Sequence, residues 1–233
     1  DTAVGKTLVT AALAWSLKEL GLDVGVMKPV ETGVVKGQRS DAGRLTRAAQ
    51  VSDALDLVRP YAFRLPVAPL DAARAERRTI KIATIMKAYR ALQAQHDLLL
   101  VEGVGGVHVP MTPKLDLLDL IEKLNAPVLV VGRVGLGGVN HALLTLNALR
   151  ERKIPNIALV LNRTVPVKTA VAGQQERSTV SLLKEFAGVP VIGPLPYVAG
   201  VDATSERAVE NLAANSEMKR LTKLVLASAR GSR

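Results

Sequence analysis

The chain begins with Asp1-Thr2-Ala3-Val4-Gly5-Lys6-Thr7, and this stretch decides the fold. Gly5-Lys6-Thr7 runs directly into an apolar, helix-like segment. In such an arrangement the N–H groups of the turn and helix start face polyphosphate oxygens, the lysine adds a positive charge, and the threonine hydroxyl can hold Mg²⁺. The alternative is an ordinary helix start with a threonine near its cap. A complete motif also has an upstream glycine after a buried strand, so we expect one central strand to precede Asp1.

Length and composition predict one domain spanning residues 1–233. The chain has 233 residues, of which 48% are apolar, and this is enough to bury a full core. It has no run of 18 apolar residues, so no membrane span is expected. Cysteine is absent. That excludes disulfides, thiolate metal sites and cysteine nucleophiles, and it is typical of a cytoplasmic protein.

The positive charge raises the question of a nucleic-acid or membrane partner. The formal net charge is +10, but the basic residues are spread along the chain. Aromatic residues make up only 3% of the sequence, so platforms for stacking nucleic-acid bases are scarce. We therefore interpret most of the charge as solvated surface and expect neither nucleic acid nor membrane as a partner.

Short apolar runs alternate with longer amphipathic stretches, which favours an α/β fold with a mostly parallel β-sheet and helices on both faces. Continuous Val, Leu and Ile content is typical of strands covered on both faces. Strands are predicted at residues 24–28, 98–102, 128–131, 157–161 and 189–192. Helices are predicted at residues 7–20, 41–49, 80–95, 115–124, 139–152, 176–186 and 206–229, with loops at 32–40 and 163–173.

Polar residues follow several of these strands, where ligands of parallel sheets gather. Lys28 ends the first predicted strand and precedes a turn containing Thr32. An ammonium at this position can face the same polyphosphate as Lys6, although a strand-end lysine can also simply reach water. Ser40 or Asp41 could simply cap the helix that follows, and the alternative is that Asp41 helps hold Mg²⁺, directly or through water.

Glu102 follows four aliphatic residues and precedes three glycines within four positions. A carboxylate there needs a partner, and Mg²⁺ suits a hard oxygen ligand; the alternative is a structural pairing. A second glycine-rich turn runs from Gly132 to His141, and we leave His141 out of the catalytic set. Asn162 and the later Pro194-Leu195-Pro196 turn are candidates either for adenine contacts or for turn chemistry.

Four separated segments agree with one family: residues 1–7, 28–33, 101–106 and 132–141. In this order and spacing the chain resembles dethiobiotin synthetase, and the likeness extends over essentially the whole sequence. The resemblance implies a P-loop NTPase-like, three-layer fold and a cytoplasmic homodimer with sites at the subunit interface. It also implies that 7,8-diaminopelargonic acid, CO₂ and MgATP are converted to dethiobiotin through a carbamate and a carbamic–phosphoric anhydride.

The resemblance also assigns roles by position. Lys6 and Lys28 are the catalytic lysines, and Mg²⁺ is held by Thr7, Asp41 and Glu102. Thr32 contacts substrate, as does a glycine turn that reaches the substrate carboxylate, made of Gly137, Gly138, Val139 and Asn140. The nucleotide contacts are Thr2, Ala3, Val4, Gly5, Lys6, Thr7, Asn162, Pro194, Leu195 and Pro196. One departure concerns Ala3, where some members carry an acidic residue.

Two rival interpretations use the same fold. A partitioning or septum-positioning ATPase would bind DNA or membrane, and the basic amphipathic stretch at residues 218–226 would suit it. Such switches carry a lysine early in the phosphate loop, and they lack the Lys28-Pro29-Val30-Glu31-Thr32-Gly33 pattern. An amidotransferase-type synthetase would need a glutaminase domain with a nucleophilic cysteine, which this chain does not contain.

Overall fold

A computed structural model describes residues 1–38, 40–199 and 205–231. The chain divides into two compact units, which are described separately. The first combines Asp1–Ser16 with Asn125–Arg233, and the second is Leu17–Leu124. All strand pairs in the named sheets are parallel, and helices pack against them, which confirms the predicted α/β class. The prediction of a single domain stays a prediction.

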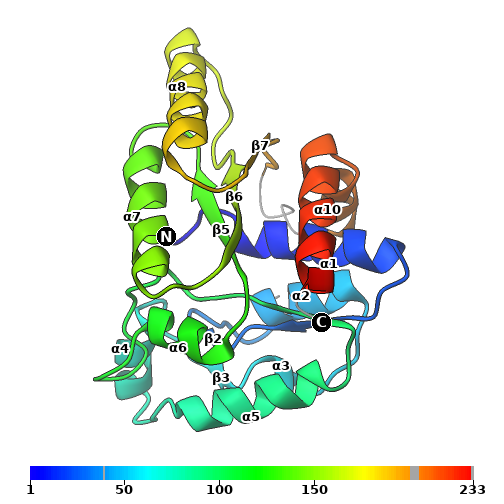
Figure 1. Ribbon diagram of the computed structural model, residues 1–233. Helices are drawn as coiled ribbons and strands as arrows, with labels where there is room; N and C mark the ends of the chain where they lie inside the picture. The colour runs from blue at the N-terminus through cyan, green and yellow to red at the C-terminus, as the bar shows by residue number, and fades with distance from the viewer. Residues whose placement is uncertain (39, 200–204, 232–233) are drawn as a thin grey trace. The chain divides into compact units, whose positions relative to one another are not determined.

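The first unit contains a three-stranded parallel sheet in the order β5–β6–β7. Its strands are β5 (Val128–Arg133), β6 (Asn156–Asn162) and β7 (Val191–Leu195). Helix α7 (Gly138–Glu151) packs on β5 and α10 (Ser216–Gly231) packs on β7, and Figure 1 shows them on opposite sides of this sheet. The remaining helices of the unit are α8 (Ala170–Phe186), α9 (Glu206–Ala213) and most of α1 (Lys6–Glu19).

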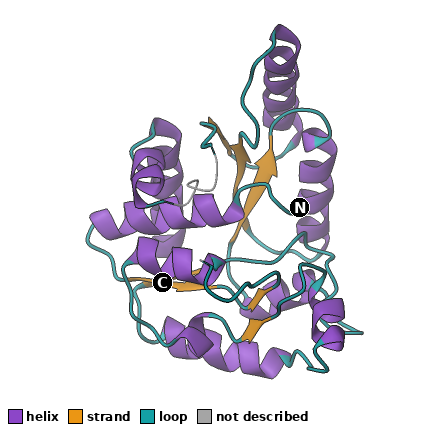
Figure 2. Cartoon of the chain, turned by 180° about the vertical axis from the view of Figure 1, so that it is seen from behind, coloured by secondary structure: helices purple, strands orange, loops and turns teal. Residues whose placement is uncertain are grey.

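The second unit contains two short parallel pairs, β1–β4 and β2–β3. The strands are β1 (Val24–Met27), β2 (Val30–Glu31), β3 (Tyr61–Ala62) and β4 (Leu98–Val101). Helices α2 (Asp41–Ala49) and α5 (Ile82–Gln93) pack against β1. The other helices are α3 (Leu55–Val58), α4 (Pro69–Ala75) and α6 (Leu117–Leu124), and Figure 2 shows the helices in purple around the strands. The core includes the fully buried Phe63, Ile85, Leu92, Met111 and Leu120.

The five predicted strands all exist, and α2 has the predicted bounds. Two predictions were wrong. Residues 170–173 are not loop, because α8 already begins at Ala170, where the Thr169 hydroxyl accepts a hydrogen bond from the Ala172 N–H. Residues 206–229 are not one continuous helix, because the helix is interrupted between the end of α9 and the start of α10. There the Asn215 side chain accepts from the Glu217 N–H and starts a new helix.

Four short elements were not predicted: β2, β3, α3 and α4. The two strands have two residues each, too few to show any periodicity. Their importance lies in position, because β2 directly follows Lys28 and ends at Glu31. Within the described ranges, no helix is both long and apolar enough to cross a bilayer.

Candidate functional site

Residues 1–7 form a tight turn that leads directly into α1. Ala3 has φ of 58° and Gly5 has φ of 96°, so both lie in the left-handed region, and the second position favours glycine. Helix α1 begins at Lys6, and its first ladder bond runs from the Val9 N–H to the Gly5 carbonyl at 3.0 Å. The N–H groups of a first helical turn have no partner within the helix, so this start can receive an anion. The Lys6 ammonium folds back and donates to the Asp1 carbonyl.

Asn162 lies against this turn. Its side chain is buried, and Nδ2 donates to the Val4 carbonyl at 3.0 Å. A side chain at position 5 would overlap the Asn162 amide, so the close approach requires Gly5. Within the described part of the chain, the buried Asn162 Oδ1 has no hydrogen-bond partner. These contacts hold the phosphate-type turn at the carboxyl end of β6, where ligands of parallel sheets bind. The adenine contact assigned to Asn162 stays a prediction.

The predicted Pro194–Pro196 turn lies beside this position, but Pro194 and Leu195 are still part of β7, which runs further than the predicted strand. In the sheet, Asn162 pairs with Leu195 on one side and with Arg133 on the other. Leu195 is buried, whereas Pro194 and Pro196 are partly exposed. The Gly193 N–H donates to the Glu217 carboxylate at 2.8 Å, which ties the start of the turn to α10. The strand ends of the first unit therefore bring the turn, Asn162 and residues 1–7 to one edge.

The predicted glycine turn lines a cavity of about 700 Å³ in the first unit. Gly137 has φ of 81° and forms the N-cap of α7, and a side chain at Gly138 would overlap the Arg133 carbonyl. Gly137, Val139 and Asn140 line the cavity. Its other wall is α8, which contributes the polar Gln174, Gln175, Ser178 and Thr179 and the apolar Val171 and Leu182. The lining holds no charged residue.

Sequence reasoning assigned no role to this wall, and it left Gln174 and Gln175 outside any helix because the predicted helix began only at residue 176. Ser178 lies four residues after Gln174 and three residues after Gln175, which places it on the same helix face as both. The signal that could have placed the two glutamines on a helix is the Thr169 cap, which starts α8 early enough to include them.

In the second unit, Lys28 lies at the carboxyl end of β1 and is 4% exposed. Its ammonium donates to the Glu102 carboxylate, which is 3% exposed and follows β4, the neighbour of β1. The Asp41 carboxylate, from the first residue of α2, lies 3.2 Å from the same ammonium. The structure therefore brings together three of the predicted residues from three separate elements. Thr32, also in this unit, is partly exposed in the segment that follows β2.

Burial opposes the charge on Lys28, but the Glu102 and Asp41 carboxylates outweigh this effect and raise the pKa of Lys28 above its ordinary value. Lys28 is therefore an ammonium at neutral pH. It can stabilise negative charge, but it cannot accept a proton there. The water-facing alternative for Lys28 does not agree with its burial.

Sequence reasoning also assigned no role to Glu31, the last residue of β2. This carboxylate is 5% exposed and accepts from the backbone N–H of Asp41 and, at 3.4 Å, from that of Ala42. It also pairs with Arg59 at 2.9 Å. Glu31 thus contacts the start of α2, the helix that carries Asp41. The sequence pattern from Lys28 to Glu31 did not predict this contact, because β2 has only two residues and shows no periodicity.

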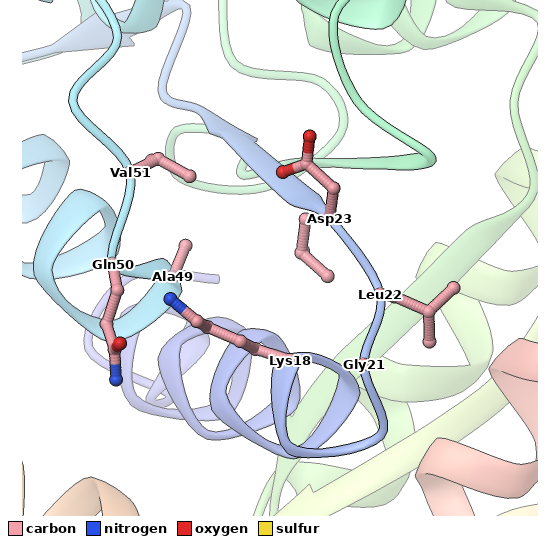
Figure 3. Close-up of a pocket in the computed structure, with 8 residues that line it drawn as sticks. Lys18, Gly21, Leu22, Asp23, Ala49, Gln50 and Val51 are labelled. Atoms are coloured by element: carbon pink, nitrogen blue, oxygen red, sulfur yellow. The ribbon is translucent and has the colours of Figure 1, made fainter.

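A smaller cavity of about 290 Å³ lies elsewhere in the second unit, near the amino end of β1 (Figure 3). Its lining includes Lys18, Asp23 and Gln50, and Figure 3 shows the Lys18 ammonium beside Ala49 with the Asp23 carboxylate directed away from it. Because this edge of the sheet is opposite to the one that carries Lys28, the cavity does not belong to the predicted site.

Comparisons with known proteins agree on one family. Residues 1–205 match the family model described as AAA domain. ATP-dependent dethiobiotin synthetase BioD of Thermodesulfovibrio yellowstonii is 39% identical over 224 residues, which cover 91% of this chain and 92% of that protein. The same enzyme of Anaeromyxobacter dehalogenans strain 2CP-C is 48% identical over 166 residues, covering 71% of this chain and 74% of that protein. The chain belongs to the ATP-dependent dethiobiotin synthetase family.

Solved structures support the fold alone. The MinC:MinD cell division protein complex of Aquifex aeolicus aligns with a TM-score of 0.54 and 16% identity, covering 96% of this chain and 93% of that one. Membership of the dethiobiotin synthetase family therefore rests on the sequence comparisons. The sequence and structure comparisons agree on the P-loop NTPase-like fold.

The residues present suit the Mg²⁺ that such ATPases use. Asp41 and Glu102 both contact one cationic group, so two hard oxygen donors are close enough to share a cation. The described residues contain no group of three or more His, Asp or Glu side chains arranged to hold a metal by themselves. Mg²⁺ usually keeps several waters and binds through one or two carboxylates plus substrate phosphates. Thr7 belongs to the other unit, so its part in the set stays a prediction.

Proposed function

We propose that this chain closes the ureido ring of dethiobiotin from 7,8-diaminopelargonic acid, CO₂ and ATP, with Mg²⁺. It is an ATP-dependent enzyme acting on small molecules and forming C–N bonds, as its family is. The observation that carries the proposal is the buried Lys28 ammonium, held between Asp41 and Glu102 at the ends of two neighbouring parallel strands. A buried ammonium can bind the terminal phosphates of a nucleotide once a divalent cation at the two carboxylates offsets their negative charge.

The reaction needs three bond-forming steps. One substrate amine adds to CO₂ and loses a proton, which gives a carbamate. A carbamate oxygen attacks the γ-phosphorus of ATP, ADP leaves, and a carbamic–phosphoric anhydride forms. The second amine then attacks the carbonyl carbon, and phosphate leaves with its oxygen as the five-membered ring closes. No protein nucleophile is required.

The second step brings two anions together, so the main task of the protein is to offset negative charge. We assign this task to Lys6, Lys28 and the N–H groups at the start of α1, with the substrate positioned by Thr32. Lys28 acts as a permanent charge, because its carboxylate partners raise its pKa. The base that accepts the amine protons is therefore a different group.

Thr7, Asp41 and Glu102 would hold Mg²⁺, which supplies further positive charge at the phosphates when it is bound. The residues of the phosphate turn (Thr2, Ala3, Val4, Gly5) and the Asn162 and Pro194–Pro196 edge are proposed to hold the nucleotide. Support comes from the Asn162–Val4 hydrogen bond, which joins these two parts of the first unit.

The carboxylate of the diamine acid is proposed to lie in the cavity lined by Gly137, Val139 and Asn140, with Gly138 shaping the turn. Two residues that line that cavity are exposed apolar side chains: Leu136 is 84% exposed and Val171 is 64% exposed. Apolar side chains gathered around one cavity favour burial against another protein surface. We propose that a second copy of the chain covers them, which gives a homodimer with the turn at the subunit interface.

The proposal includes a cytoplasmic location and no nucleic-acid or membrane partner. The test is a coupled assay of phosphate release with the purified protein, ATP, Mg²⁺, bicarbonate and the diamine acid, with dethiobiotin identified by mass spectrometry. Phosphate release should need both the diamine and bicarbonate, and the product should match the phosphate in amount. Hydrolysis that DNA or anionic vesicles stimulate, but the diamine does not, would point to the partitioning-type ATPase instead.

A further inference from the structure

We infer that Glu31 is a positioning residue: it fixes the Asp41 backbone so that the Asp41 carboxylate is held toward Lys28 and the proposed Mg²⁺ position. The inference rests on the proposed function and adds a residue for which neither family resemblance nor motif supplied a role. It starts from the burial of Glu31, which is 5% exposed and lies three residues after Lys28.

Burying a carboxylate is costly unless hydrogen bonds and a counter-charge offset the loss of water. Glu31 has both. Its two oxygens accept from the Asp41 and Ala42 N–H groups, and Arg59 supplies the counter-charge. Arg59 is itself largely buried, so this pair forms inside the second unit rather than at its surface.

The contact with α2 is more than a helix cap. That helix already has a cap, because the Ser40 hydroxyl accepts from the Gly43 N–H at 3.1 Å. Glu31 instead binds the first two N–H groups of the helix, and it reaches them from a neighbouring strand. The effect is to attach the first turn of α2 to the end of β2, which the Ser40 cap cannot do.

Asp41 therefore makes contacts of two kinds, one through its backbone and the others through its side chain. Its N–H is bound by Glu31, and its carboxylate lies 3.2 Å from the Lys28 ammonium and 3.3 Å from Arg44. In the proposed reaction, Lys28 must also interact with phosphate oxygens. If Lys28 were the main anchor of Asp41, the carboxylate would lose its place as Lys28 turned to the nucleotide. The Glu31 contact holds Asp41 independently of Lys28.

The charges are arranged consistently with this role. Arg59 offsets the Glu31 charge, so Glu31 adds little negative potential at Lys28, and its influence passes through the Asp41 N–H. Groups that orient metal-binding residues from behind typically change metal affinity by about 10- to 100-fold when they are removed.

The test measures Mg²⁺-dependent binding of ADP by isothermal titration calorimetry, alongside thermal stability by circular dichroism. In Glu31→Ala we expect the Mg²⁺ concentration needed for tight ADP binding to rise about tenfold. The matched control is Ser40→Ala, which weakens the same end of α2 without releasing the Asp41 N–H. It should lower stability while leaving the Mg²⁺ requirement unchanged. Glu31→Gln keeps an oxygen that can accept from Asp41 and should stay within about threefold of the unaltered protein.

Equal Mg²⁺ requirements in Glu31→Ala and Ser40→Ala would overturn the inference, because Glu31 would then be only a structural residue. A Glu31→Gln protein as impaired as Glu31→Ala would overturn it too, since the hydrogen bond to Asp41 would not matter. An unaltered protein that binds ADP equally well without Mg²⁺ would refute both this inference and the Mg²⁺ site. Failure of the proposed reaction itself is seen separately, in the product assay.

Discussion

Replacing Lys28 by Met tests the central electrostatic arrangement. Lys28 is 4% exposed and Glu102 is 3% exposed, so the substitution leaves a buried carboxylate without the ammonium that now contacts it. Removing one member of a buried ion pair typically costs about 3–5 kcal/mol of folding free energy. We expect a loss of this size, with Asp41 adding to it because its carboxylate is directed at the same ammonium.

The assay is equilibrium urea denaturation at pH 7.5, followed by far-ultraviolet circular dichroism. The pKa of Lys28 is raised, so its stabilising contribution is complete below the unfolded pKa of about 10.4 and is lost only as pH rises through the higher folded pKa. Measurement at pH 7.5 therefore records the full effect. A double-mutant cycle with Glu102→Gln isolates the interaction between Lys28 and Glu102. The double variant should lose about 1–3 kcal/mol less unfolding free energy than the sum of the losses in the two single variants.

Two results would refute this reasoning. One is a Lys28→Met protein with an unchanged free energy of unfolding, and the other is a cycle with no coupling between positions 28 and 102. Catalysis supplies an independent measure, because losing one charge-stabilising donor costs about 3–4 kcal/mol in the barrier. The kcat of Lys28→Met should therefore fall at least ~100-fold, and a turnover close to that of the unaltered protein would exclude the assigned role.

Three further predictions concern other positions. Lys6→Ala should also lower kcat at least ~100-fold while the circular dichroism spectrum stays the same, and normal turnover would contradict its role. Gly5→Ala should abolish ADP binding in calorimetry, because a side chain at φ of 96° is strained and overlaps the Asn162 amide; unchanged affinity would mean that the turn is not the phosphate site. His96 should make stability depend on pH: burial lowers its pKa, but hydrogen bonds with Asp23 and Asp53 outweigh this and raise it. The stabilising contribution of His96 is complete below the unfolded pKa of about 6.5 and is lost as pH rises through the folded pKa. In His96→Gln, the free energy of unfolding from urea denaturation should therefore vary less with pH over this range. An identical pH dependence in the variant would contradict the assignment.

What the sequence predicted best are features that one segment determines by itself. Strand β4 is a run of four aliphatic residues, and α2 begins after a serine cap, so both follow from local pattern. The same reasoning merged α9 and α10, because apolar residues keep a helical spacing on both sides of Asn215. The break is marked by the hydrogen bond from the Glu217 N–H to the Asn215 side chain. A single polar residue in a helical pattern does not predict such a break.

In the candidate site, too, some features follow from local sequence patterns and others depend on tertiary contacts. Lys28, Asp41 and Glu102 were selected because each follows or begins an element, and the rule that ligands gather at the carboxyl ends of parallel strands predicted their meeting within the second unit. The Glu31–Arg59 pair was not predictable in this way. Its partners are 28 residues apart, and their contact depends on how β2 and the end of α3 are arranged, which no local pattern contains.

The charges of the Lys28 group also indicate how the proposed site would treat its nucleotide. Lys28 and Arg44 together match the charge of the Asp41 and Glu102 carboxylates, so this group by itself has no surplus positive charge to attract a polyphosphate. A bound divalent cation would supply that surplus and let Lys28 interact with phosphate instead of only with its carboxylate partners. Because the side chains of Lys28, Asp41 and Glu102 are buried or partly buried, salt screens the interactions among them only weakly. We therefore predict that nucleotide binding at the proposed site requires Mg²⁺, because the acidic residues around Lys28 occupy its positive charge until a divalent cation is bound.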